Sequence, residues 1–186
     1  MNRLTGLKLG GLGPGFIVWV KKDEGQRHIM ETALIEYGNF LVAGVTVNAT
    51  ESTDFAAVWD ELFERVSDEQ KTATVKLQKV GVLMPDAADE GFTYTAGFIV
   101  QGIPAVAALG LTGVVVPAAM YATVLVEGPA ADSIKPGFEY LHSTFIPEKG
   151  ITPTGVNLEV YGPGDVTASN YRMYCWSAVD GVESPI

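Results

Sequence analysis

A weak internal repeat constrains the fold more than any other feature of the sequence. Residues 54–66 (DFAAVWDELFERV) place apolar side chains on one face of an amphipathic helix. The same rhythm returns 79 residues later, in SIKPGFEYLHSTFIP, where Pro136 and Gly137 fit only a first turn or a preceding loop. The offset also matches three pairs of strand patterns, which are 40–49 with 118–128, 79–86 with 158–165, and 92–100 with 171–179.

Each half of the chain is therefore predicted to fold as strand, helix, strand, strand. Neither half buries its helix and three strands well alone, so we expect one α+β domain with pseudo-twofold symmetry. The predicted architecture is an antiparallel sheet with helices on one face and a ligand groove on the other, where the repeats meet. The expected boundaries are about 36–101 and about 115–180 for the two repeats, within a domain of residues 30–186. The glycine-rich residues 1–29 are expected to be an N-terminal extension outside that domain.

The longest uncharged run, Gly91 to Val126, is predicted to hold strands rather than a membrane helix. Pro104 and Pro117 would interrupt a helix, and the β-branched residues within 112–116 favour extended structure. We therefore interpret residues 102 to about 117 as a bridge between the repeats, and the rest of the run, up to Val126, as the first strand of repeat two. If it is exposed, the apolar segment 102–119 would be a natural homodimer surface.

Charge and composition exclude several classes of function. The net charge of the 186 residues is −10, and no basic stripe is present to neutralise nucleic-acid phosphates. With one cysteine, Cys175, and two distant histidines, His28 and His142, we expect neither an internal disulfide nor a structural zinc site. No P-loop, metal motif or Ser-His-Asp pattern indicates a cofactor or a metal. We expect a cytoplasmic protein that contacts neither nucleic acid nor membrane directly.

The order and spacing of several short motifs resemble a known family. The matching residues are Tyr94, Gly97, Val116-Pro117, Tyr121-Ala122, Gly128-Pro129, Phe138 to Leu141, residues 147–150 and Glu159-Val160-Tyr161. They are similar to those of the GyrI-like small-molecule-binding domain, which also forms the effector-binding part of some AraC-type and MerR-type transcription regulators. The resemblance covers roughly residues 30–180.

The chain departs from the family pattern in two ways. Thr93 and Thr95 stand in a strand where the family often carries an acidic residue, and the apolar bridge is longer than expected. The 29 residues before the domain cannot hold a helix-turn-helix, so we expect the stand-alone form of the domain.

The resemblance implies a function. GyrI-like pockets commonly pair a glutamate with aromatic side chains, which implies a hydrophobic, aromatic or cationic ligand such as a xenobiotic or effector. Some stand-alone relatives hydrolyse electrophilic, cyclopropane-bearing toxins, so hydrolysis with Glu159 as general base is an alternative. A family namesake inhibits DNA gyrase, so gyrase or a regulator is a further candidate partner.

Strand alternation sorts the candidate ligand-binding residues near the second repeat's turn. Leu158 and Val160 are expected to face the helices, which turns Asn157, Glu159 and Tyr161 toward the groove. Alternation alone leaves Glu159 as either a surface carboxylate or a pocket residue, and the resemblance favours the pocket.

In the last strand, Met173 and Cys175 are expected on the helix side, and Arg172, Tyr174 and Trp176 on the groove side. Tyr174 and Trp176 fit a pocket wall and an ordinary core equally well. Arg172 would either pair with the neighbouring strand's glutamate or point to solvent.

Four aromatic residues complete the candidate set. Tyr121, in the first strand of repeat two, is a candidate pocket wall, and the face of Tyr94 is ambiguous. Trp59 and Phe63 lie on the apolar stripe of the predicted helix, so we expect them in the core with an edge toward the pocket.

Overall fold

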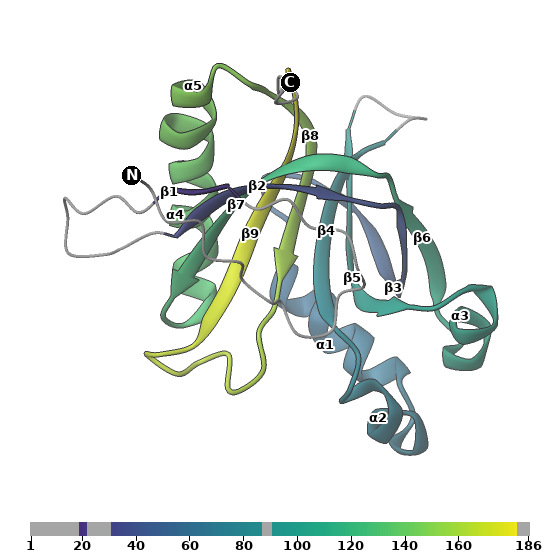
Figure 1. Cartoon of the computed structure of the whole chain (residues 1–186). Helices are drawn as coiled ribbons and strands as arrows, with labels where there is room; N and C mark the ends of the chain where they lie inside the picture. Colours follow the sequence, from purple (N-terminus) through teal and green to yellow (C-terminus); the bar gives the residue numbers. More distant parts are fainter. Residues whose placement is uncertain (1–18, 22–30, 87–90, 182–186) are drawn as a thin grey trace. The chain divides into compact units, whose positions relative to one another are not determined.

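The computed structural model describes residues 19–21, 31–86 and 91–181, which separate into two compact units (Figure 1). Of the described residues, the first unit contains 19–21, 31–38, 119–154 and 162–181, and the second contains 39–86, 91–118 and 155–161. Both units combine helices with antiparallel strands, which confirms the predicted α+β class. None of the helices within the described ranges has the length and apolarity that a membrane crossing requires.

The second unit is built on five antiparallel strands in the order β8-β4-β5-β3-β6. These are β3 (Phe40–Ala49), β4 (Lys79–Pro85), β5 (Phe92–Val100), β6 (Thr112–Val116) and the part of β8 (Thr152–Val160) that begins at Gly155. The helices are α1 (Phe55–Arg65), α2 (Asp68–Thr74) and α3 (Ile103–Leu109). The strands β3, β4 and β5 and the helix α1 coincide closely with the predicted elements of repeat one.

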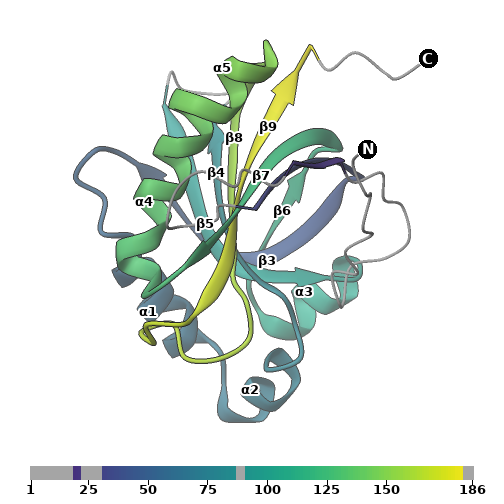
Figure 2. The same ribbon diagram turned by 60° about the vertical axis from the view of Figure 1, so that its left-hand side comes forward.

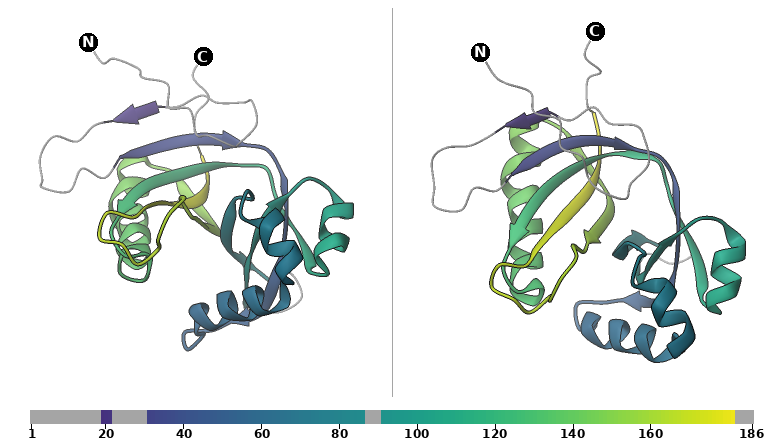
Figure 3. Two further views of the ribbon diagram at one scale, coloured as in Figure 1. Left: turned by 90° about the horizontal axis from the view of Figure 1, so that it is seen from below. Right: turned by 60° about the horizontal axis from the view of Figure 1, so that its bottom comes forward.

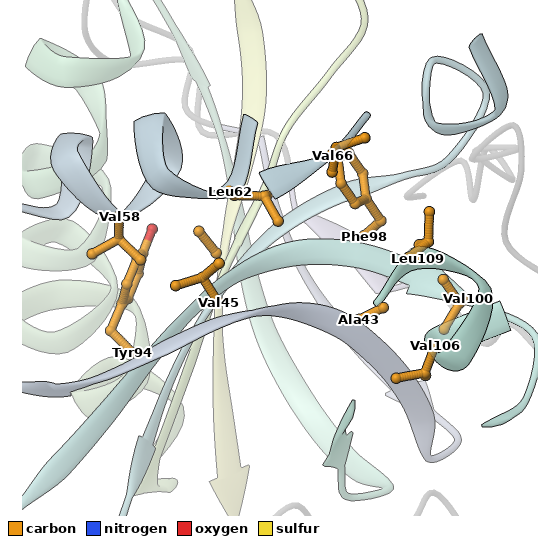
Figure 4. Packing of buried hydrophobic residues seen from close by; sticks show 11 residues of the cluster. Ala43, Val45, Val58, Leu62, Val66, Tyr94, Phe98, Val100, Val106 and Leu109 are labelled. Atoms are coloured by element: carbon orange, nitrogen blue, oxygen red, sulfur yellow. The ribbon is translucent and has the colours of Figure 1, made fainter. Parts of the chain in front are cut away.

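Helix α1 begins at a cap and packs through one stripe. The Asp54 carboxylate accepts hydrogen bonds from two backbone N–H groups of the first turn, which otherwise have no partner within the helix. Val58 and Leu62, one turn apart, are buried against strand side chains that include Val45, Tyr94 and Phe98 (Figure 4). Burying a side chain such as Leu62 stabilises the fold by about 1.5–3 kcal/mol.

The bridge between the repeats is structured, which corrects its interpretation as a linker. Its first half forms α3, which ends at Gly110 with a φ of 66°, a left-handed conformation that glycine adopts without strain. Its second half forms β6, which pairs with β3, and α3 packs on the same two strands (Figure 3). Val106 and Leu109 of α3 belong to the buried core.

The first unit has the strand order β1-β2-β7-β9, again antiparallel. Its elements are β1 (Trp19–Lys21), β2 (Thr32–Tyr37), β7 (Ala119–Glu127), α4 (Ala130–Tyr140), the π-helix η1 (Leu141–Phe145), α5 (Ile146–Lys149) and β9 (Arg172–Asp180). β1, which pairs with β2, comes from the segment 1–29 that was expected to lie outside the domain. The rest of that segment, apart from these three residues, lies outside the described residues.

Helix α4 begins earlier than predicted. It starts at Ala130, so Pro136 and Gly137 lie inside it and not in a first turn or a loop. Gly137 is buried where the helix packs on β7 and β9 (Figure 2), and a Cβ there would lie 2.8 Å from the Cys175 sulfur and 2.9 Å from a methyl carbon of Val126. The missing side chain therefore allows the helix to approach the strands closely.

Candidate functional site

The acidic centre of the second unit is Glu159 on β8. The hydroxyl of Tyr94, on β5, donates a hydrogen bond of 2.8 Å to Glu159 Oε2, and the hydroxyl of Tyr161 donates one of 2.9 Å to the same oxygen. From the residues that the structure describes, no hydrogen bond reaches the other carboxylate oxygen, Oε1. The carboxylate is therefore fixed through one oxygen and keeps the acceptor capacity of the second.

Helix α1 supplies a second layer of aromatic side chains. The Trp59 indole Nε1 donates to the Tyr94 hydroxyl oxygen at 3.0 Å, and the Trp59 ring meets the Tyr161 ring edge-on at 4.9 Å. Phe55, one turn before, lies 4.5 Å from the Tyr94 ring. The result is a directed chain from indole to phenol to carboxylate, in which each donor orients the next group.

The space for the carboxylate exists because residue 81 is glycine. Gly81 on β4 is directly opposite Glu159 in the strand register. A Cβ at Gly81 would lie 2.3 Å from Glu159 Oε2 and 2.6 Å from the Tyr94 hydroxyl oxygen. Glycine inside a strand often marks such a close approach, and here it leaves room for both hydrogen-bonded atoms.

The register shows which strand face holds this cluster. Alternation separates the buried Leu158 and Val160 from the partly exposed Glu159, as predicted. However, Gly81 of β4 pairs with Glu159 of β8 on one side and with Ala96 of β5 on the other, so the three residues lie on the same face of the sheet. Ala96 belongs to the core beneath α1. Within the second unit the glutamate thus shares the face that α1 covers, which corrects the expectation that it lies on the face away from the helices.

The surroundings shift the ionisation of both central groups. Burial raises the pKa of the Glu159 carboxyl group above its usual value, and the hydrogen bonds from Tyr94 and Tyr161 offset part of that effect. Burial and the adjacent carboxylate raise the pKa of Tyr94 far above its usual value, so this phenol remains a proton donor at neutral pH. Glu159 is therefore a hydrogen-bond acceptor that is shielded from water and held by the uncharged hydroxyl groups of Tyr94 and Tyr161.

Two phenylalanines extend the cluster to the surface. Phe63, 5.9 Å from the Trp59 ring, is 42% exposed, which corrects its predicted place in the core. Phe55 is 38% exposed. Sequence reasoning missed Phe55, which was assigned to the apolar stripe alone, and Gly81, whose position inside a strand was the available signal.

The remaining predicted site residues belong to the first unit. Trp176 on β9 is 2% exposed, and its ring lies 5.6 Å from that of Tyr37 on β2 and 5.6 Å from that of Tyr121 on β7. Burial raises the pKa of Tyr121 to about 12. The Trp176 Nε1 atom is buried and has no hydrogen-bond partner among the described residues. These side chains form an aromatic core, and the predicted groove between the repeats stays a prediction.

Two further residues that were considered for the groove, Tyr174 and Arg172, are also on β9. Tyr174 is partly buried, and burial together with nearby Glu31 raises its pKa. Arg172 lies 3.6 Å from Glu127 on β7 in an exposed ion pair, a partner that the sequence did not suggest. Such exposed pairs contribute little stability.

The described residues contain no group of three or more His, Cys, Asp or Glu side chains arranged to hold a metal ion. The cluster around Glu159 places a carboxyl group among aromatic side chains. It can accept a hydrogen bond or a proton, and it can neutralise a cation.

Comparisons with known proteins identify the family. Residues 33–179 match the model of the Cass2 family, described as integron-associated effector binding protein. No curated protein matches the chain. Among solved structures, SAV2435 bound to tetraphenylphosphonium is 16% identical with a TM-score of 0.63, and the match covers 82% of this chain and 95% of that one.

Two further structures share the fold. The EcmrR C-terminal domain is 18% identical with a TM-score of 0.58, over 83% of this chain and 100% of that one. The integron cassette protein VCH_CASS2 of Vibrio cholerae is 12% identical with a TM-score of 0.55, over 88% and 99%. The chain therefore belongs to the Cass2 family of integron-associated effector-binding proteins.

Proposed function

We propose that this effector-binding domain binds a hydrophobic organic cation, with Glu159 as the anionic anchor and aromatic side chains as the surrounding wall. The observation that carries the proposal is the unequal use of the two carboxylate oxygens. Two phenols hold Oε2, whereas Oε1 receives no hydrogen bond from the described residues. An oriented, poorly solvated carboxylate attracts a cation more strongly than a solvated one does.

The aromatic side chains favour a large apolar cation over a small hydrated one. Trp59 and Tyr161 surround the acid, and the exposed Phe55 and Phe63 extend the same surface. Aromatic faces attract organic cations and contribute about 0.5–2 kcal/mol per contact. The net charge of −10 also raises the local concentration of cations.

The structure of SAV2435 with tetraphenylphosphonium supports this class of ligand, because that cation is permanently charged, apolar and aromatic. It is a suitable probe, since it has no acidic proton and can meet a carboxylate only through charge. Isothermal titration of tetraphenylphosphonium into the protein, beside the neutral triphenylphosphine oxide, tests the preference for charge.

The decisive variant is Glu159→Gln, which keeps the shape and the acceptor oxygen but removes the charge. We expect it to bind tetraphenylphosphonium about tenfold or more weakly, because a close charge pair contributes about 1.5 kcal/mol or more. Glu64→Gln, on the exposed side of α1, is the matched control and should bind like wild type. Equal affinities of wild type and Glu159→Gln would exclude Glu159 as the anchor.

Hydrolysis of an electrophilic ligand is a second candidate, favoured by the raised pKa of Glu159. A carboxylate of increased basicity can remove a proton from an attacking water. In that case Glu159→Gln abolishes turnover of a cyclopropane-bearing electrophile while the ligand still binds. A pure binding protein gives thermal stabilisation by the ligand and no product. A regulator or DNA gyrase as partner, and a cytoplasmic location, stay predictions from the sequence.

A further inference from the structure

The outermost strands of the two units have edges of very different character. In the first unit, β1 has only three residues. Very short edge strands resist pairing with other chains. In the second unit, β6 is the last strand of the order, and its five residues, TGVVV, include neither a charge nor a proline. It lacks the usual protections of an edge strand.

The outer edge of β6 is suited to pair with an extended chain. β3 pairs with its inner side in an unbroken register, from Phe40 opposite Val116 to Gly44 opposite Thr112. No described strand pairs with its outer side. Val115 is 61% exposed, so an apolar side chain of this strand is accessible. Free N–H and C=O groups along such an edge are a template for another strand.

Charge indicates which strand this edge accepts. The net charge of −10 makes two copies of the protein repel each other wherever their acidic surfaces meet. β6 lies inside the run from Gly91 to Val126, which contains no charged residue, so the pairing of β6 with itself brings no like charges of this segment together. Two identical strands related by a twofold axis run antiparallel, and each therefore complements the other. We propose that β6 pairs with β6 of a second copy to form a homodimer.

The test combines a variant with a matched control. Val115→Lys places a charge on the edge, where two copies would meet, and Val75→Lys places the same charge at an 82% exposed position that follows α2. Both positions are exposed, so both variants should fold. Analytical ultracentrifugation over a dilution series should show a wild-type dimer, a Val75→Lys dimer of similar affinity, and a Val115→Lys dimer at least about tenfold weaker, a change of 1.4 kcal/mol or more.

Hydrogen exchange identifies the contact directly. Backbone amides within 112–116 should exchange more slowly at high protein concentration than after dilution, and Val115→Lys should abolish that difference. A wild-type monomer at all concentrations overturns the proposal, and so does a dimer that Val115→Lys leaves intact. Amides of β6 that stay equally protected at every concentration also overturn it, because the edge is then covered within one chain. The outcome is independent of ligand binding at Glu159.

Discussion

The two units hold their aromatic clusters together in different ways. In the second unit, Trp59, Tyr94 and Tyr161 direct their N–H and O–H groups along a chain that ends on Glu159. In the first unit, Trp176 is as deeply buried as Tyr94, yet its Nε1 hydrogen meets no acceptor among the described residues. Hydrogen bonds directed at Glu159 thus organise the cluster of the second unit, whereas the packing of rings holds the cluster around Trp176 together. The Trp176 N–H without a described acceptor reduces the stability of that second cluster. The difference separates a cluster arranged around a charge from one that is mainly core.

The largest expected effect comes from filling the space beside the acid. Gly81→Ala would push Glu159 and Tyr94 out of their hydrogen bond and should lower the free energy of unfolding by about 1–3 kcal/mol. Gly113→Ala, on β6, is the control, because its Cβ would meet only ordinary contacts of 3.4 Å and more. Urea unfolding measures both. Equal stabilities of the two variants would show that the cluster tolerates rearrangement.

The next largest effect compares one deletion in each cluster. Tyr94→Phe removes the link between Trp59 and Glu159 and leaves two polar groups with fewer partners, at a cost of about 1–3 kcal/mol. Trp176→Phe also creates a cavity but removes a donor that has no described partner, so its net cost should be smaller. Thermal or urea unfolding ranks the two variants. A larger loss for Trp176→Phe would mean that the indole N–H has an important partner.

A smaller effect is the pH dependence that Glu159 contributes. Because its folded pKa lies above the usual 4.5, the folded protein binds the proton more tightly than the unfolded chain does. The contribution of this group therefore favours folding below pH 4.5 and is lost as the pH rises through the folded pKa. Glu159→Gln should flatten this part of the stability profile, whereas Glu64→Gln should retain it. Parallel profiles of Glu159→Gln and wild type between pH 4 and 8 would contradict the raised pKa.

The smallest stability effect is expected at the surface of the same cluster. Phe63→Ala removes a ring that is already 42% exposed, so the free energy of unfolding should fall by less than about 1 kcal/mol. Tetraphenylphosphonium should nevertheless bind several-fold more weakly, since an aromatic wall is lost. Calorimetry and urea unfolding on the same variant separate the two effects. Unchanged affinity would place the ligand away from Phe63.

Local patterns predicted much of the fold. The spacing of Val58 and Leu62 located α1, and five strands, β3, β4, β5, β7 and β9, were found almost to the residue. The prediction was wrong for β8, which begins at Thr152 and ends at Val160, whereas the pattern at 158–165 indicated a strand and turn. Two differences between prediction and structure have local causes: α3 is too short for a periodic pattern, and Pro136 is typical of a helix boundary although α4 tolerates it. Alternation grouped Glu159 with Tyr161 correctly. It could not assign their face, because the pairing of β8 with β4 is a long-range contact.

The indole of Trp59 has a practical consequence. Its N–H is bonded to the phenol that holds the acid, so any ligand that displaces or polarises Tyr94 also changes the electrostatic environment of this fluorophore. The chain has three tryptophans, and Trp176 lies in the other unit. Replacing Trp19 and Trp176 by phenylalanine would leave one emitter, whose wavelength and quenching report occupancy in real time without a label. The hydrogen-bond chain that orients the carboxylate is thus also an optical readout of the site.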